Sequence, residues 1–252
     1  MLEPLTSAEE CVEASSGDPL VTQLVTRWVP EPGSWRLGAA VGARCSWWGY
    51  AELYVIGPPE DSAALVREAV AAGERGPRLS TSRRARALLP WPAEAVEHTW
   101  AFRSTASPPA VPTDVAAWLA DPVSEVAGLL ARAFADASMQ ADDPHVRRWA
   151  GIRAADGGLV ACVADGTADD RLGFFASLTV DPATRGAGLG ERLSAWVTAE
   201  LLREHPRVGL WHMGENLVAD RLYTRLGFRD DHQMVAFPTP GGSRIGSVRG
   251  EA

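Results

Sequence analysis

Three observations in the sequence predict an α/β (α+β) fold built from two domains. Strand-like runs at 146–153, 159–164 and 172–180 follow one another with short turns between them, which is typical of an antiparallel meander. From Leu189 onward the apolar spacing changes from that of a strand to that of a helix. A segment with three prolines, 107–112, separates this region from an N-terminal part with strand and helix patterns of its own.

The N-terminal part, residues 1–110, predicts a smaller α/β domain. Proline, glycine and capping residues divide it into short segments of helical or strand-like spacing. In chain order we expect a helix over 19–28, strands over 35–41 and 46–56, a helix from Asp61 or Ser62 to Ala72, and a strand over 98–104. The arginine cluster at 83–86 is interpreted as solvent-exposed surface, the usual place for this residue.

The second domain, residues 113–252, is expected to have its core in 122–238. A helical region is predicted from Thr113 to about Ala137, with an interruption at Asp121-Pro122. Four apolar residues of this region recur at helical spacing and predict one buried face: Val126, Leu129, Leu130 and Phe134.

Composition narrows the classes of function and of partner. The chain has 32 Asp+Glu against 24 Lys+Arg, a net charge of −8, and every basic residue is an arginine, so we expect no nucleic-acid partner. The acidic N-terminal segment and the lack of a long apolar run predict a cytoplasmic protein without a membrane partner. Three separated cysteines and five histidines show no metal-ligand spacing, so we expect no metal site.

The segment 178–190 carries the most informative pattern. It runs from an apolar strand through an arginine and three glycines into a helix. Gly186, Gly188 and Gly190 remove side chains where the backbone would approach a ligand, and the unpaired N–H groups of a helix start suit a pyrophosphate. An ordinary glycine-rich turn explains the same residues equally well. The segment is neither a P-loop, which needs Gly-Lys-Ser/Thr, nor a G-x-G-x-x-G dinucleotide fingerprint.

Two motifs in the second domain resemble the signatures of the GNAT acetyltransferase superfamily. Residues 185–190, Arg-Gly-Ala-Gly-Leu-Gly, match the family's R/Q-x-x-G-x-G/A signature for acetyl-CoA. Residues 216–228, Asn-Leu-Val-Ala-Asp-Arg-Leu-Tyr-Thr-Arg-Leu-Gly-Phe, match its N-x-x-A-x-x-L-Y-x-x-L-G-F helix at every specified position. The motifs occur in the family's order, separated by a helix and the strand 208–213, and the resemblance covers about residues 122–238.

This resemblance implies a GNAT-like, mixed and mostly antiparallel sheet, flanked by helices, that splays after the strand ending at Val180. It also implies acetyl-CoA, or coenzyme A, as the cosubstrate. Backbone groups of Leu178 and Val180 are expected to bind the pantetheine amides, and Asn216 to contact the pantetheine arm. The remaining residues expected to bind the cofactor form the pyrophosphate loop: Arg185, Gly186, Ala187, Gly188 and Gly190.

Tyr223 is the expected catalytic residue. Attack of an amine on a thioester expels a thiolate, and a phenol with a pKa of ~10 can protonate that thiolate. A packing role for Tyr223 is the alternative.

The general base is not assigned by the sequence. The strand before the loop, 173–178, has no carboxylate, and Trp211 occupies the position on the next strand where the family places a glutamate. Strand alternation directs His212 to the face opposite Trp211. The amine is therefore expected to lose its proton through ordered water or to bind already neutral.

The sequence as a whole predicts an acyl-CoA-dependent N-acetyltransferase that acts on a primary amine by direct attack in a ternary complex. No cysteine lies in either motif to serve as an acyl carrier. Two alternatives stay open: a non-catalytic CoA-binding sensor or regulatory module, and an acyltransferase that uses a longer acyl-CoA. Metabolite amines, antibiotics, amino acids and protein N-termini all fit as acceptors, and a homodimer is compatible with the sequence.

The role of residues 1–110 is a separate hypothesis. Their strand and helix order loosely resembles the first domain of two-domain family members such as glycine N-acyltransferase-like proteins. We interpret the segment as a degenerate GNAT-like domain without a cofactor loop, which forms a wall of the acceptor site or an interface.

Overall fold

The computed structural model describes residues 1–27, 33–47, 50–74, 76–92, 97–110 and 116–242. The chain forms two compact units, which are described separately. The first comprises Met1–Phe102, Met213–Glu215 and His232–Ala252, and the second comprises Arg103–His212 and Asn216–Asp231. The predicted domain boundary at 110–113 stays a prediction, since 111–115 lie outside the described residues.

The first unit contains a mixed sheet in which one parallel pair interrupts antiparallel neighbours. Its strand order is β1 (Glu3–Pro4), β2 (Trp35–Leu37), β3 (Ala40–Trp47), β4 (Tyr50–Ile56), β5 (Arg78–Ser82) and β12 (Arg229–Pro238). Strands β4 and β5 are parallel, while β12 pairs with β5 in antiparallel register from Met234 to Pro238. A further strand, β6 (His98–Thr105), matches the prediction over 98–104 within one residue and contributes residues to both units, as does β12.

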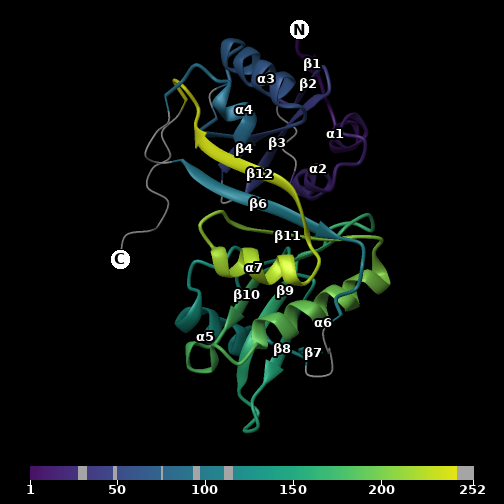
Figure 1. Cartoon of the computed structure of the whole chain (residues 1–252), viewed down its shortest axis with the longest axis vertical. Helices are drawn as coiled ribbons and strands as arrows, with labels where there is room; N and C mark the ends of the chain where they lie inside the picture. The colour runs from purple at the N-terminus through teal and green to yellow at the C-terminus, as the bar shows by residue number, and fades with distance from the viewer. Residues whose placement is uncertain (28–32, 48–49, 75, 93–96, 111–115, 243–252) are drawn as a thin grey trace. The chain divides into compact units, whose positions relative to one another are not determined.

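Helix α3 (Pro59–Ala71) covers the sheet of the first unit (Figure 1). Its buried residues Leu65, Val66 and Ala69 have helical spacing and pack with strand residues such as Leu53 and Phe237. The other helices of this unit are short: α1 (Ala8–Ala14), α2 (Pro19–Leu24), the 3-10 turn η1 (Val25–Arg27) and α4 (Arg83–Ala87). The predicted helix over 19–28 is thus confirmed as a helix followed by a 3-10 turn, with Trp28 outside the described residues.

Several expectations for the first unit are wrong in detail. The run 35–41 contains a turn at Gly38, whose φ of +59° ends β2, and the run 46–56 holds the end of β3 and all of β4. Helix α3 begins at Pro59, because Asp61 accepts a hydrogen bond from the Ala39 N–H (2.8 Å) instead of capping the helix. Arg86 is buried, since its guanidinium donates to Glu97 and to two backbone carbonyls.

The second unit contains the predicted antiparallel meander. Its strand order is β11 (Val208–Met213), β10 (Gly173–Val180), β9 (Leu159–Asp165), β8 (Arg148–Arg153) and β7 (Ala117–Trp118). All neighbours are antiparallel except β10 and β11, which are parallel, so the sheet is mixed and mostly antiparallel as predicted. The strand boundaries expected at 146, 159, 172 and 208 differ from these by at most two residues.

Two helices of the second unit pack on one core. Helix α6 (Leu189–Glu204) lies across β8, β9 and β10, and α7 (Leu217–Arg225) buries Leu222 and Tyr223 in the same apolar cluster (Figure 1). Phe175 of β10 belongs to this cluster, in ring contact with Tyr223 and Phe228. None of the helices in the described ranges has the length and apolar content that a membrane span needs.

Helix α5 (Val123–Ala133) is shorter than the predicted helical region, of which 113–115 lie outside the described residues. Strand β7 takes up 117–118, and the helix ends where Phe134 adopts an extended φ of −161°. Val126, Leu129 and Leu130 are buried as predicted, whereas Phe134 is 43% exposed because it lies beyond the last helical turn.

Replacing Phe175 with alanine is expected to lower the free energy of unfolding by about 3–5 kcal/mol, because its ring is only 1% exposed and leaves a cavity in the shared core of α6 and α7. Phe134→Ala is the matched control, and we expect it to cost less than half as much. Urea denaturation followed by circular dichroism measures both. Equal losses would contradict this packing.

Candidate functional site

Strands β10 and β11 separate soon after they begin. Their parallel pairing is confined to Gly173 with Val208 and Phe174 with Gly209. Beyond these pairs β10 continues for six residues, from Phe175 to Val180, without a partner in β11. The sheet therefore splays at this point, as the family resemblance implies, and backbone groups on this edge of β10 are available to a ligand.

A β-bulge marks the opening in β10. The register with β9 shifts between Ala176 and Thr179, and Ser177 inside the bulge has a φ of +56°. Its hydroxyl oxygen accepts a hydrogen bond from the Met139 N–H (2.8 Å), which holds this conformation. Leu178 follows within the bulge, where pairing with β9 is interrupted.

Val180 directs its backbone toward the open edge. The next residue, Asp181, donates its N–H to the Val160 carbonyl of β9 (2.8 Å). Since alternate residues of a strand direct their N–H and C=O groups to opposite neighbours, those of Val180 point away from β9. The N–H and C=O groups of Val180 therefore lie on the open edge, where binding of a pantetheine amide is expected.

The loop 185–190 leads from β10 into α6. Gly186 (φ +85°) and Gly188 (φ +73°) adopt left-handed conformations that favour glycine, and an added Cβ would meet no atom within 4 Å at either position. The glycines are therefore required by the backbone conformation, and open space lies next to them. The first hydrogen bond of α6 is donated by the Arg192 N–H to the Gly188 carbonyl (3.1 Å). The N–H groups of the three preceding residues are directed out of the helix N-terminus, where an anion is stabilised.

The loop lies against the end of β10. A Cβ at Gly190 would be 3.5 Å from Val180 Cγ2 and 3.9 Å from Leu178 Cδ2, so the helix start approaches the two strand residues that are expected to bind pantetheine. Ala187 lies between the two left-handed glycines, and Arg185 donates to the Ala133 carbonyl (3.4 Å).

A short 3-10 turn, η2 (Pro182–Thr184), sets the direction of the loop. Asp181 caps it by accepting the Ala183 N–H (3.0 Å), and its other oxygen accepts from Arg132 Nε (2.8 Å). The hydrogen bond from Arg132 lowers the pKa of Asp181, so this carboxylate stays ionised and paired at neutral pH. Its charge is thereby balanced beside a loop that is expected to bind phosphate.

Tyr223 lies in an aromatic cluster next to the splayed strands. Its side chain is 6% exposed, and its ring centroid is 5.8 Å from that of Phe228, 6.0 Å from that of His212 and 6.1 Å from that of Phe175. Burial raises the pKa of the Tyr223 phenol above its ordinary value. No hydrogen bond joins its hydroxyl to another residue in the described part of the chain.

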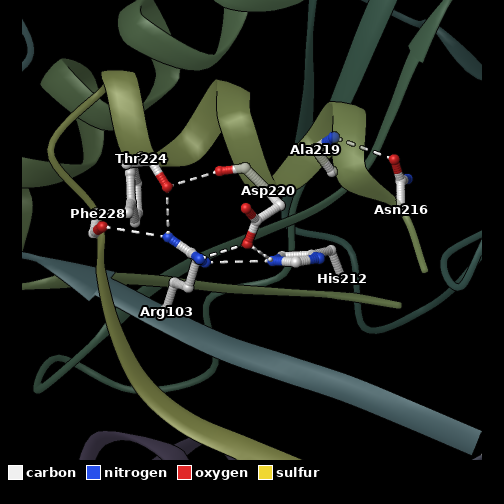
Figure 2. Close-up of polar contacts among 7 residues, drawn as sticks. All are labelled: Arg103, His212, Asn216, Ala219, Asp220, Thr224 and Phe228. Atoms are coloured by element: carbon white, nitrogen blue, oxygen red, sulfur yellow. Dashed lines mark hydrogen bonds and ion pairs between the residues drawn. The ribbon is translucent and has the colours of Figure 1, made fainter. Parts of the chain in front are cut away.

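The second motif is tied to the first by helix α7. Asn216 caps α7 by accepting the Ala219 N–H with its side-chain oxygen (3.0 Å), which leaves the exposed amide nitrogen as its only side-chain donor (Figure 2). Arg225, in the last turn, donates to both carboxylate oxygens of Glu191 (3.2 Å each), the residue after Gly190. The structure thus brings the loop, the end of β10 and α7 together.

The chain resembles a known family both in sequence and in fold. Residues 150–236 match the family model described as FR47-like protein. The chain is similar in structure to two GCN5-related N-acetyltransferases. For the protein from Kribbella flavida the identity is 22% and the TM-score 0.56, over 91% of this chain and 96% of that one. For the protein from Sphaerobacter thermophilus the identity is 15% and the TM-score 0.59, over 93% of this chain and 91% of that one.

An acetyltransferase from the GNAT family of Colwellia psychrerythraea has 11% identity and a TM-score of 0.57, with coverage of 95% and 100%. Residues 150–236 form an FR47-like domain with the GNAT fold. A comparison with curated protein sequences found no match. The predicted fold class is confirmed, and the match over residues 150–236 agrees with the predicted family resemblance.

The two faces of the GNAT sheet at the splay carry different residues. Trp211 packs on Phe174 (4.9 Å between ring centroids), whereas His212 and Phe175 both face Tyr223. His212 therefore points away from Trp211, as strand alternation predicts, and it is buried. In the sequence, neither β10 nor β11 has an Asp or Glu to act as a base.

One buried charge of the GNAT unit was missed by the sequence analysis. Arg103 of β6 is 5% exposed, and its guanidinium bonds to residues of β11, of α7 and of the turn after α7 (Figure 2). The only signal in the sequence is a single arginine between apolar and hydroxyl residues of a predicted strand. Such a residue is typical of a buried ion pair, although its partner cannot be identified from the pattern.

The Tyr223 phenol is expected to stay protonated at pH values where an exposed tyrosine ionises, about pH 10. The measurement is the difference in absorbance at alkaline pH between wild type and Tyr223→Phe, below the pH of unfolding. Since the unfolded state then loses a proton that the folded state keeps, the stability of wild type is expected to fall relative to Tyr223→Phe as pH rises above that value. Ordinary titration of Tyr223 in the folded protein would contradict this burial.

Proposed function

We propose that the protein is an N-acetyltransferase that moves the acetyl group of acetyl-CoA to a primary amine. The observation that carries the proposal is the opening between β10 and β11, next to the left-handed glycine loop at the start of α6. It combines a free strand edge, which can pair with the amides of a pantetheine arm, with a helix N-terminus, which can bind a pyrophosphate. Acetyl-CoA would supply the activated thioester.

The proposed reaction is a direct transfer. The amine nitrogen forms a bond to the thioester carbonyl carbon, the carbon–sulfur bond breaks, and Tyr223 donates its proton to the departing sulfur. The nitrogen releases one proton to water, and the Tyr223 phenolate regains a proton from water before the next turnover. The raised pKa keeps the Tyr223 phenol protonated at neutral pH, so the donor is present when the amine attacks. The same shift makes the phenol a weaker acid, so the proposed transfer depends on its position beside the sulfur and not on its acidity.

The cysteines support direct transfer over a covalent acyl-enzyme. Cys162 is the cysteine that pairs with β10, opposite Thr179. Burial raises the pKa of its thiol to about 12, so the nucleophilic thiolate is scarce at neutral pH. Cys11 and Cys45 belong to the first unit and are also buried.

A CoA-binding sensor without activity is the second candidate. The observation that favours it is the lack of a carboxylate in β10 and β11, where the family resemblance leads us to expect a base. Release of CoA from acetyl-CoA in the presence of an amine would exclude the sensor. The chain has no lysine, so transfer to its own side-chain amines adds no background to this assay.

Gly188→Glu is expected to abolish binding of acetyl-CoA, because it places bulk and negative charge at the helix N-terminus. We expect the wild type to bind with micromolar affinity, about −8 kcal/mol, measured by calorimetry. Gly157→Glu is the matched control, since Gly157 also has a positive φ (+89°) and open space but lies in the β8–β9 turn. A folded wild type without binding would overturn the proposal.

Tyr223→Phe is expected to lower kcat by on the order of 10²-fold, with KM for acetyl-CoA changed little, because the phenyl ring keeps the packing and loses only the proton donor. Acetyl-CoA is assayed with a panel of amino acids, polyamines, aminoglycosides and peptides. Tyr54→Phe in the first unit is the matched control. An unchanged kcat in Tyr223→Phe would remove the phenol from the mechanism.

A further inference from the structure

The guanidinium of Arg103 donates hydrogen bonds to four residues of the second unit. Its Nε donates to His212 Nε2 (3.2 Å) and its Nη2 to Asp220 Oδ1 (2.5 Å). Its Nη1 donates to Thr224 Oγ1 (3.0 Å) and to the Phe228 carbonyl (3.5 Å). Figure 2 shows these four partners around the guanidinium, with Asp220 and Thr224 side by side on α7.

The four partners of Arg103 are neighbours of Tyr223, two through ring contacts and two along helix α7. His212 and Phe228 are two of the three aromatic residues in ring contact with it. Asp220 and Thr224 lie one turn before and directly after Tyr223 on α7, and the Thr224 hydroxyl also donates to the Asp220 carbonyl (2.8 Å). Arg103 itself makes no ring contact with Tyr223, so any influence on the phenol is transmitted by these neighbours.

The charges of this cluster are balanced. Asp220 supplies the negative charge for a cation that is otherwise buried, which offsets the cost of desolvation. His212 accepts the Arg103 Nε–H with its Nε2, so its neutral ring carries the proton on Nδ1 and has a fixed orientation. An apolar side chain would fill the same space at lower desolvation cost, but it would fix neither α7 nor the His212 ring.

We infer that Arg103 is a positioning residue for Tyr223, an inference that rests on the proposed function of that phenol. The Tyr223 hydroxyl has no hydrogen bond to the described residues, so its helix and its ring neighbours determine where it lies. Arg103 bonds to both. A misplacement of ~1 Å at a reacting group can cost on the order of 10²-fold in rate, which makes such positioning consequential.

Arg103→Met tests the inference by kinetics. We expect kcat to fall at least ~10-fold with KM for acetyl-CoA nearly unchanged. The kcat of Arg103→Lys is expected to lie between those of wild type and Arg103→Met, because an ammonium cannot bond to all four acceptors. In the Tyr223→Phe background, Arg103→Met is expected to have almost no further effect on kcat, since the group that it positions is gone. Additive losses would overturn the inference.

Fluorine NMR supplies a readout that does not require activity. The chain has three tyrosines, so protein labelled with 3-fluorotyrosine gives three signals, and Tyr223→Phe identifies one. We expect Arg103→Met to shift or broaden the Tyr223 signal. Arg148→Met is the matched control, because Arg148 is also ion-paired, with Asp165 (2.9 Å) and Glu204 (2.6 Å), and stacks on Trp118. It is expected to leave the Tyr223 signal unchanged.

The two readouts separate failure of the inference from failure of the proposed function. If wild type turns over no amine, the proposed function fails, and the fluorine signal alone then tests whether Arg103 sets the position of the phenol. If Arg103→Met does not fold, Arg103→Lys and Asp220→Asn are measured in its place. A Tyr223 signal that stays unchanged in every folded variant would overturn the inference.

Discussion

The arrangement of the second unit depends on the early end of pairing between β10 and β11. Had the parallel register continued beyond Phe174, the backbone groups of the later β10 residues would be bonded within the sheet. The bulge at Ser177 lies in the stretch of β10 that has no partner in β11, and its left-handed conformation is held by the hydrogen bond from Met139. The open edge, the glycine loop and α7 then meet at one place. If β10 and β11 stayed paired along their length, no open strand edge would be left for a ligand.

Burial serves two purposes at Tyr223. It fixes the ring among Phe175, Phe228 and His212, and it raises the pKa of the phenol so that the proton is kept. No hydrogen bond to the described residues fixes the hydroxyl, so its position depends on the helix that carries Tyr223 and on the rings beside it. Arg103 joins the helix that carries Tyr223 to the His212 ring and to the backbone carbonyl of Phe228. A charged residue in this core therefore has a role that an apolar one would not fill.

Much of the fold could be predicted because its signals are local. The strands of the meander and β11 follow from apolar period and turn residues, and their bounds agree with the structure to about two residues. The failures come from tertiary contacts. Asp61 bonds to the Ala39 N–H rather than to its own helix, Arg86 is buried by carbonyls of a neighbouring loop, and Phe134 lies beyond the end of α5. None of these partners is visible in the spacing of residues.

The sequence by itself determined the glycine loop, the second motif and the identity of Tyr223, because left-handed turns, helix caps and helical periodicity are set by residues close together in the chain. Only the tertiary structure decided where β10 leaves β11, how deeply Tyr223 is buried and which groups surround it. Arg103 bonds to residues between 109 and 125 positions away, and the choice of partner at such separations depends on geometry and desolvation in the folded core.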